Sequence, residues 1–219
     1  MEITKVEKSL AKSGNCKSLV IFLHGYGANG ADLIGLSKPL SGHFSDTTFL
    51  SPNAFEACPG NPLGFQWFPI DWLYGEKKFN TESEIEAPIS ILRSWINAQM
   101  SDYGVPAAKT VIIGFSQGTM MALHLATRGT DRFAGVVGFS GKLMGSKNLS
   151  KKYKTKMPIL LVHGTDDEVV PIENLNEASD ALLSVGYRTF VHVSKGIGHG
   201  IGPDGLNATI KFIKRFIEA

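Results

Sequence analysis

Short uninterrupted runs of apolar residues recur along the chain and alternate with longer amphipathic stretches. Such runs are typical of strands that are buried on both faces, as in a parallel sheet covered by helices. The opening segment Ile3–Lys8 alternates apolar with polar residues instead and predicts an antiparallel edge strand. The predicted buried strands are Ser18–Leu23, Thr47–Leu50, Thr110–Gly114, Ala134–Phe139, Ile159–Val162 and Arg188–Val193.

Between these runs the apolar residues follow helical spacing. One apolar stripe runs from Ile85 to Ile96, and because of Pro88 its helix either starts later than the acids Glu82, Glu84 and Glu86 suggest or is kinked. A second stripe runs from Leu206 to Ile217, and Ala31–Leu40 and Thr119–Thr127 are further helical segments. Strands that alternate with helices of this length form βαβ units. We therefore expect residues 1–219 to form a single α/β domain with a doubly wound, mostly parallel sheet.

Composition narrows the class of protein. The 219 residues are 43% hydrophobic and 19% charged, which suits one sizeable core and excludes a disordered chain. The net charge of +2 argues against nucleic acid as a partner, because nucleic-acid binding needs clustered cations. Cys16 and Cys58 fit neither a disulfide framework nor a zinc pattern, and no H-x-x-x-H or C-x-x-C spacing occurs. We expect no metal ion and no cofactor.

The N-terminal segment does not resemble an export signal, because charged residues interrupt it from Glu2 to Lys12. The longest apolar runs are strand-sized, far below the ~20 residues that a transmembrane helix needs. The sequence therefore predicts a cytoplasmic protein without a transmembrane segment.

The segment Gly114-Phe115-Ser116-Gln117-Gly118 follows a predicted strand and precedes a predicted helix. This is the G-x-S-x-G pattern of the nucleophile elbow, a tight strand-to-helix turn that exposes a serine hydroxyl. Glycine is needed two positions before and after the serine because the strand and the helix crowd together there. Ser116 is therefore the candidate nucleophile.

A serine nucleophile needs a base, and the base needs an acid that orients it. His199 lies in a glycine-rich loop between the last strand and the last helix, from which it can reach the serine; structural roles are expected for His24, His43, His124, His163 and His192. Three acids, Asp166, Asp167 and Glu168, follow the strand Ile159–Val162. The chain order Ser116, Asp167, His199 is the order of the α/β-hydrolases, and Asp166 remains the alternative acid.

Four segments together resemble the phospholipase/carboxylesterase family, which includes the acyl-protein thioesterases. These segments are Leu23–Gly30, Gly114–Gly118, His163–Pro171 and Gly198-His199. The resemblance extends from about Ser18 to the C-terminus, with the motifs in the same order. It implies an α/β-hydrolase fold without a large lid, and it selects Asp167 over Asp166. The family often has proline after that acid, where this chain has Glu168.

The resemblance also implies a mechanism and a class of substrate. One oxyanion donor is expected to be the backbone N–H of Gln117, and the family suggests that of Tyr26 as the other. The segment after Cys58 resembles an apolar loop beside the acyl site of the family. An acyl groove is therefore predicted from Leu63, Phe65, Trp67, Phe68 and Leu73; alternatively, these residues cover the core beneath a long connection.

The predicted activity is that of a serine carboxylesterase acting on short- to medium-chain acyl esters. By resemblance, acyl thioesters and lysophospholipids are further substrates, so the partner is a small acyl compound, a lipid or an acylated protein. The chain is expected to be a monomer or a homodimer.

Two alternatives come from other classes of protein. Gly25-Tyr26-Gly27-Ala28-Asn29-Gly30 spells G-x-G-x-x-G after a strand, as in dinucleotide-binding oxidoreductases. That function needs an acid at the end of the second strand, whereas Asp46 precedes this strand. The other alternative is a binding protein with the hydrolase fold and an idle triad, which the presence of Ser116, Asp167 and His199 disfavours.

Overall fold

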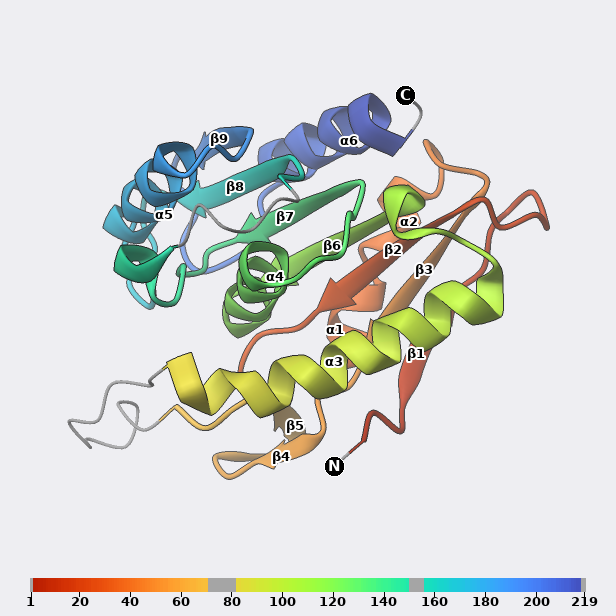
Figure 1. Cartoon of the computed structure of the whole chain (residues 1–219), viewed down its shortest axis with the longest axis horizontal. Coiled ribbons are helices and arrows are strands. Elements are labelled where there is room, and N and C mark those ends of the chain that lie inside the picture. The colour runs from red at the N-terminus through yellow and green to blue at the C-terminus, as the bar shows by residue number, and fades with distance from the viewer. Residues whose placement is uncertain (1, 71–81, 150–155, 218–219) are drawn as a thin grey trace.

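The computed structural model describes residues 2–70, 82–149 and 156–217 (Figure 1). Its strands are β1 (Val6–Ser9), β2 (Ser18–Leu23), β3 (Thr47–Pro52), β4 (Glu56–Cys58), β5 (Asn61–Gln66), β6 (Thr110–Phe115), β7 (Gly135–Phe139), β8 (Ile159–Gly164) and β9 (Thr189–Ser194). Its α-helices are α1 (Gly30–Ile34), α2 (Ser37–Leu40), α3 (Glu82–Tyr103), α4 (Gln117–Arg128), α5 (Glu173–Ser184) and α6 (Pro203–Ile217).

Seven strands form one twisted sheet in the order β1-β3-β2-β6-β7-β8-β9. All neighbouring pairs are parallel except β1 with β3, which confirms both the parallel core of the sheet and the antiparallel edge strand. The strand order reverses between β2 and β6, the kind of switch point at which α/β sheets bind ligands beyond the carboxyl ends of their strands.

The buried strand residues divide between the two faces of the sheet because successive side chains point to opposite sides. On one face, Ile21 and Ile112 belong to a core that includes residues of α3, α4 and α5. On the other face, Val20 and Val111 pack in a core with residues of α1, α2 and α6. Helices therefore cover both faces of the sheet, and α3 and α4 lie in front of it in Figure 1. The predicted doubly wound fold is confirmed.

Three local features differ from the expectations. The predicted helix Ala31–Leu40 is divided into α1 and α2 at Gly35 and Leu36. Helix α3 begins at Glu82 and continues through Pro88, so the alternative of a later start is wrong. The antiparallel hairpin β4–β5 was not predicted, because its strands are short and largely half-buried or exposed.

Helix α3 has 22 residues, about the length that a transmembrane helix needs. Neither α3 nor any other helix within residues 2–70, 82–149 and 156–217 is long and apolar enough to cross a membrane.

Candidate active site

The turn between β6 and α4 holds Ser116 in a backbone conformation that is rare for residues other than glycine. Its φ is 53° and its ψ is −115°, and such strain persists only where the surroundings enforce it. A Cβ at Gly118 would lie 1.9 Å from the carbonyl oxygen of Leu23, and one at Gly114 would lie 2.4 Å from that of Gly118. Both glycines are therefore required for this close passage of the helix over the strand.

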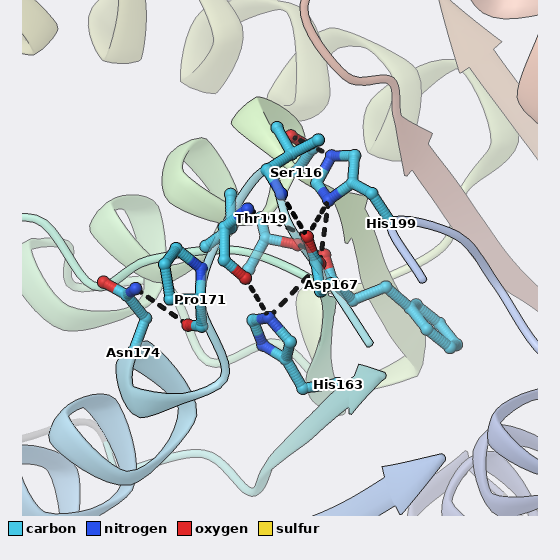
Figure 2. Close-up of polar contacts among 10 residues, drawn as sticks. Ser116, Thr119, His163, Asp167, Pro171, Asn174 and His199 are labelled. Carbon is cyan, nitrogen blue, oxygen red and sulfur yellow. Dashed lines mark hydrogen bonds and ion pairs between the residues drawn. The ribbon is translucent and has the colours of Figure 1, made fainter. Parts of the chain in front are cut away.

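Ser116, His199 and Asp167 form a continuous hydrogen-bonded chain (Figure 2). The Nε2 atom of His199 lies 3.0 Å from the Ser116 hydroxyl oxygen, and its Nδ1 atom lies 2.8 Å and 3.0 Å from the two Asp167 carboxylate oxygens. A carboxylate only accepts hydrogen bonds, so Nδ1 carries the proton. Nε2 is then the acceptor that faces the serine hydroxyl, as a general base requires.

Asp167 is held as a carboxylate inside the protein. Burial raises the pKa of this carboxyl, but hydrogen bonds from the Val170 amide, His199 and the Val169 amide outweigh the burial and leave the pKa below its ordinary value. Its Oδ1 atom accepts the Val170 and Val169 amides at 2.8 Å and 3.0 Å. Asp166 is exposed and accepts a hydrogen bond from the Thr165 hydroxyl. Of the two candidate acids, only Asp167 contacts the imidazole of His199.

A second histidine supports the same carboxylate. The Nε2 atom of His163, a buried residue at the end of β8, lies 3.3 Å from Oδ2 of Asp167 and donates to the carbonyl of Val170 at 2.8 Å. His163 therefore ties the loop after Asp167 back to the strand (Figure 2). The sequence predicted a structural role for His163 without this contact. His163 precedes the acid by four residues, but this spacing predicts a contact only within a helix, so the sequence carried no signal for it.

The two predicted oxyanion donors lie in turns that flank Ser116. Gln117 is the first residue of α4, where the backbone N–H has no acceptor within the helix. Tyr26 lies in the turn after β2, and Gly27 in that turn has a φ of +73°. The hairpin braces this turn, because the amide of Gly27 donates to the carbonyl of Phe65 at 2.9 Å. These are the two turns from which the predicted oxyanion donors would come.

Comparison with known proteins agrees with this geometry. Residues 5–217 match the family model described as Phospholipase/Carboxylesterase. The chain belongs to the phospholipase/carboxylesterase family. It is therefore a carboxylic ester hydrolase with the α/β-hydrolase fold.

Individual members of the phospholipase/carboxylesterase family resemble the chain over most of its length. The esterase YpfH of Escherichia coli is 27% identical and the alignment covers 84% of this chain and 77% of YpfH. The acyl-protein thioesterase 1 homolog 1 of Dictyostelium discoideum is 29% identical, with 90% and 89% covered. Esterase PE8, whose crystal structure is known, has 35% sequence identity with this chain. The two structures superpose with a TM-score of 0.91 over 99% of this chain and all of the PE8 chain.

In this esterase, buried polar contacts connect the turn at Gln117 with the turn after β2. The side chain of Gln117 accepts the Trp67 amide at 2.9 Å and donates to the Phe68 carbonyl at 2.7 Å. The Trp67 indole in turn donates to the carbonyl of His24 at 2.9 Å. His24 donates from Nδ1 to the Gly25 carbonyl and accepts the Ala54 amide at Nε2. Burial of His24 lowers its pKa to about 4 and keeps the ring neutral.

The prediction of an acyl groove is wrong for Trp67 and Phe68. Both side chains are fully buried in the core on the face of the sheet that α3, α4 and α5 cover. This agrees with the alternative prediction that these residues cover the core beneath a long connection. Leu63, in strand β5, is 80% exposed, and Phe65 of the same strand is half-buried. Leu73 lies outside the described residues.

The remaining predicted features of this esterase have ordinary structural surroundings. Asp46 precedes β3 and pairs with Lys17, so it does not occupy the ribose position of a dinucleotide-binding domain. The His124 ring pairs with Glu86 of α3, and the His192 ring pairs with Asp204 of α6. Cys16 and Cys58 are free cysteines.

Proposed function

We propose that this chain hydrolyses short- to medium-chain acyl esters and thioesters through an acyl-enzyme formed on Ser116, with His199 as general base and Asp167 as its orienting acid. The observation that carries the proposal is the hydrogen-bonded chain from Ser116 through His199 to the buried Asp167. The family assignment supports the reaction class, and the geometry supports these three residues as its agents.

In the proposed first step, the Ser116 oxygen attacks the substrate carbonyl while its proton moves to Nε2 of His199. The Asp167 carboxylate stabilises the imidazolium that results. The negative charge that develops on the carbonyl oxygen is accepted by the backbone N–H groups of Gln117 and Tyr26, each worth about 3 kcal/mol in comparable sites.

The tetrahedral intermediate then breaks down. The bond between the carbonyl carbon and the leaving oxygen or sulfur breaks, and His199 returns its proton to that atom. A water molecule next gives a proton to His199 and attacks the ester on Ser116, which releases the carboxylic acid and restores the serine hydroxyl. One proton is taken up and given back in each half of the cycle, so no further reactant is required.

Thioesters and lysophospholipids extend the proposed substrate range. The Dictyostelium relative is named an acyl-protein thioesterase, which supports thioesters, including acylated cysteine in proteins, as substrates of this chain. Leu63 and Phe65 of the hairpin remain the proposed border of the acyl site. We also propose that the protein acts in the cytoplasm as a monomer or homodimer, in keeping with its two unpaired cysteines.

The test is steady-state hydrolysis of nitrophenyl esters of graded chain length, beside acyl-CoA and lysophospholipid, by wild type and Ser116→Ala. The proposal expects ester and thioester turnover that falls at least about 1,000-fold in Ser116→Ala. If Ser116→Ala keeps more than a few per cent of the activity, the proposed mechanism is wrong. If wild type hydrolyses none of these compounds and its Ser116 is not labelled by a fluorophosphonate, the chain is a binding protein with the hydrolase fold.

A further inference from the structure

A cavity of about 260 Å³ lies on the side of the sheet covered by α1, and Phe115, the residue before Ser116, forms part of its wall. Its described lining is four apolar side chains and one carboxylate: Leu33, Leu36, Phe115, Ile201 and Asp32. We call these five residues the leaving-group cavity. None of them belongs to the hydrogen-bonded chain of Ser116, His199 and Asp167, and the predicted acyl groove does not include them.

The cavity is next to the histidine that must protonate the leaving group. The Phe115 ring, which forms part of the wall, lies 5.0 Å from the His199 ring between centroids, and Ile201 follows His199 by two residues. General acid catalysis requires the leaving oxygen or sulfur to lie within hydrogen-bond reach of Nε2 of His199. The leaving group therefore departs on the side of Ser116 where His199 lies, and Phe115 is the cavity residue whose ring packs against that histidine.

The carboxylate of Asp32 gives the cavity a charge preference. Asp32 is exposed in the first turn of α1, and its Oδ2 atom accepts the Asn29 amide at 2.9 Å in a capping box. This hydrogen bond fixes the carboxylate beside the apolar wall. A cation next to a carboxylate and an aromatic ring is stabilised, whereas an anion is repelled.

We propose that the leaving-group cavity receives the apolar stem of the departing alcohol or thiol, and that Asp32 selects leaving groups that carry a positive charge. This inference rests on the proposed acyl transfer at Ser116. The substrate class it names is an ester or thioester of an amino alcohol, an amino thiol or a thiol flanked by basic groups.

The test compares four thioesters with one acyl group. The leaving thiols of three of them have similar length: thiocholine is cationic, 3,3-dimethylbutanethiol is its uncharged carbon analogue, and 3-mercaptopropionate is anionic. The fourth, S-methyl thiobutyrate, is too short to enter the cavity. The quaternary ammonium also makes thiocholine the more acidic and better leaving thiol. The effect of Asp32 is therefore measured as the change, between wild type and variant, in the ratio of kcat/KM for butyrylthiocholine to kcat/KM for its carbon analogue. We expect a change of about threefold, as for other exposed charge pairs, and an opposite change for the anion.

Two variants separate charge from shape. Asp32→Asn keeps an acceptor for the Asn29 amide, and we expect it to lower the ratio between butyrylthiocholine and its carbon analogue about threefold. Leu36→Trp fills the cavity, and we expect it to raise KM for the longer thioesters relative to S-methyl thiobutyrate. Asp102→Asn is the control and should keep the wild-type ratio. Asp102 is also an exposed acid, but it lies near the end of α3, before β6 begins, whereas Ser116 follows the end of β6.

The inference is wrong if Asp32→Asn leaves the ratio at its wild-type value, if Asp102→Asn changes the ratio as much, or if Leu36→Trp affects all four thioesters equally. These results differ from a failure of the proposed function. In that case, wild type would hydrolyse none of the four thioesters and no nitrophenyl ester.

Discussion

Replacement of Asp167 by asparagine removes one negative charge and leaves the shape of the side chain almost unchanged. The direction in which the new amide points is set by the loop. The Oδ1 atom of Asp167 accepts the backbone amides of Val169 and Val170, so the carbonyl oxygen of the asparagine takes that place. The NH₂ group then takes the place of Oδ2, 2.8 Å from Nδ1 of His199.

This orientation reverses the proton arrangement of His199. The NH₂ group donates, so Nδ1 must accept and the ring proton moves to Nε2, which then cannot take the proton of Ser116. Turning the amide around would leave the amides of Val169 and Val170 without an acceptor, at a cost of about 1–3 kcal/mol each. The equivalent change in a serine protease lowers kcat about 10,000-fold, and we expect a loss of about 1,000- to 10,000-fold here, or about 4–5.5 kcal/mol.

The assay is kcat for nitrophenyl butyrate at pH 7.5, with the free energy of unfolding measured in urea to show that each variant is folded. Asp166→Asn is the matched control, because Asp166 is exposed and has no contact with His199 among the described residues. We expect it to keep kcat within about twofold, as for a surface change. Retention of more than a tenth of kcat in Asp167→Asn, or an equal loss in Asp166→Asn, would refute this assignment.

Three further changes test the frame around the site. Because burial lowers the pKa of His24 to about 4, the unfolded chain binds a proton there that the folded chain does not, and the free energy of unfolding should fall by up to about 3 kcal/mol from pH 6.5 to 4. Urea denaturation at pH 7 and 4.5 should show a smaller fall for His24→Asn; equal falls would contradict this. Trp67→Phe loses the indole donor to the His24 carbonyl, and we expect kcat to fall about five- to tenfold with KM unchanged. Steady-state kinetics measure kcat and KM, and stopped-flow kinetics measure the acylation step, so a slower reaction is distinguished from a loss of substrate binding. Gly118→Ala places a Cβ 1.9 Å from a backbone oxygen and should destabilise the fold by more than about 3 kcal/mol, whereas Gly42→Ala, with no heavy atom within 4 Å, should stay within about 0.5 kcal/mol; equal denaturation midpoints would overturn the steric argument.

The sequence predicted the parts of the molecule that local pattern determines. Continuous apolar runs identified the inner strands of the large sheet, since their side chains are buried on both faces. The run Arg188–Val193 also predicted a strand, but β9 lies at the edge of the sheet and Val191 and Val193 are exposed, so its predicted burial on both faces is wrong. The elbow around Ser116 was recognisable because its two glycines are fixed by steric contact with neighbouring backbone. The position of His199 followed from its loop after the last strand.

Long-range polar contacts could not be predicted in the same way. An apolar aromatic residue such as Trp67 suits a groove as well as a core. Its hydrogen bonds with Gln117 and His24, which are distant in sequence, place it in the core, where it connects the turn at Gln117 with the turn after β2. The division between α1 and α2 and the passage of α3 through Pro88 likewise depend on tertiary packing, which outweighs helix propensity. The cavity beside Phe115 arises from three separate segments and has no pattern along the chain.

Intact-mass spectrometry of the protein, mixed with nitrophenyl butyrate and quenched within milliseconds, would show whether Ser116 carries the acyl group. We expect that one butyryl group is added per chain, that fragmentation places it on Ser116, and that it decays at the turnover rate in wild type. We expect no addition to Ser116→Ala and slow formation in Asp167→Asn. A butyryl group on another residue, or full turnover by Ser116→Ala, would show that the acyl-enzyme does not form on Ser116.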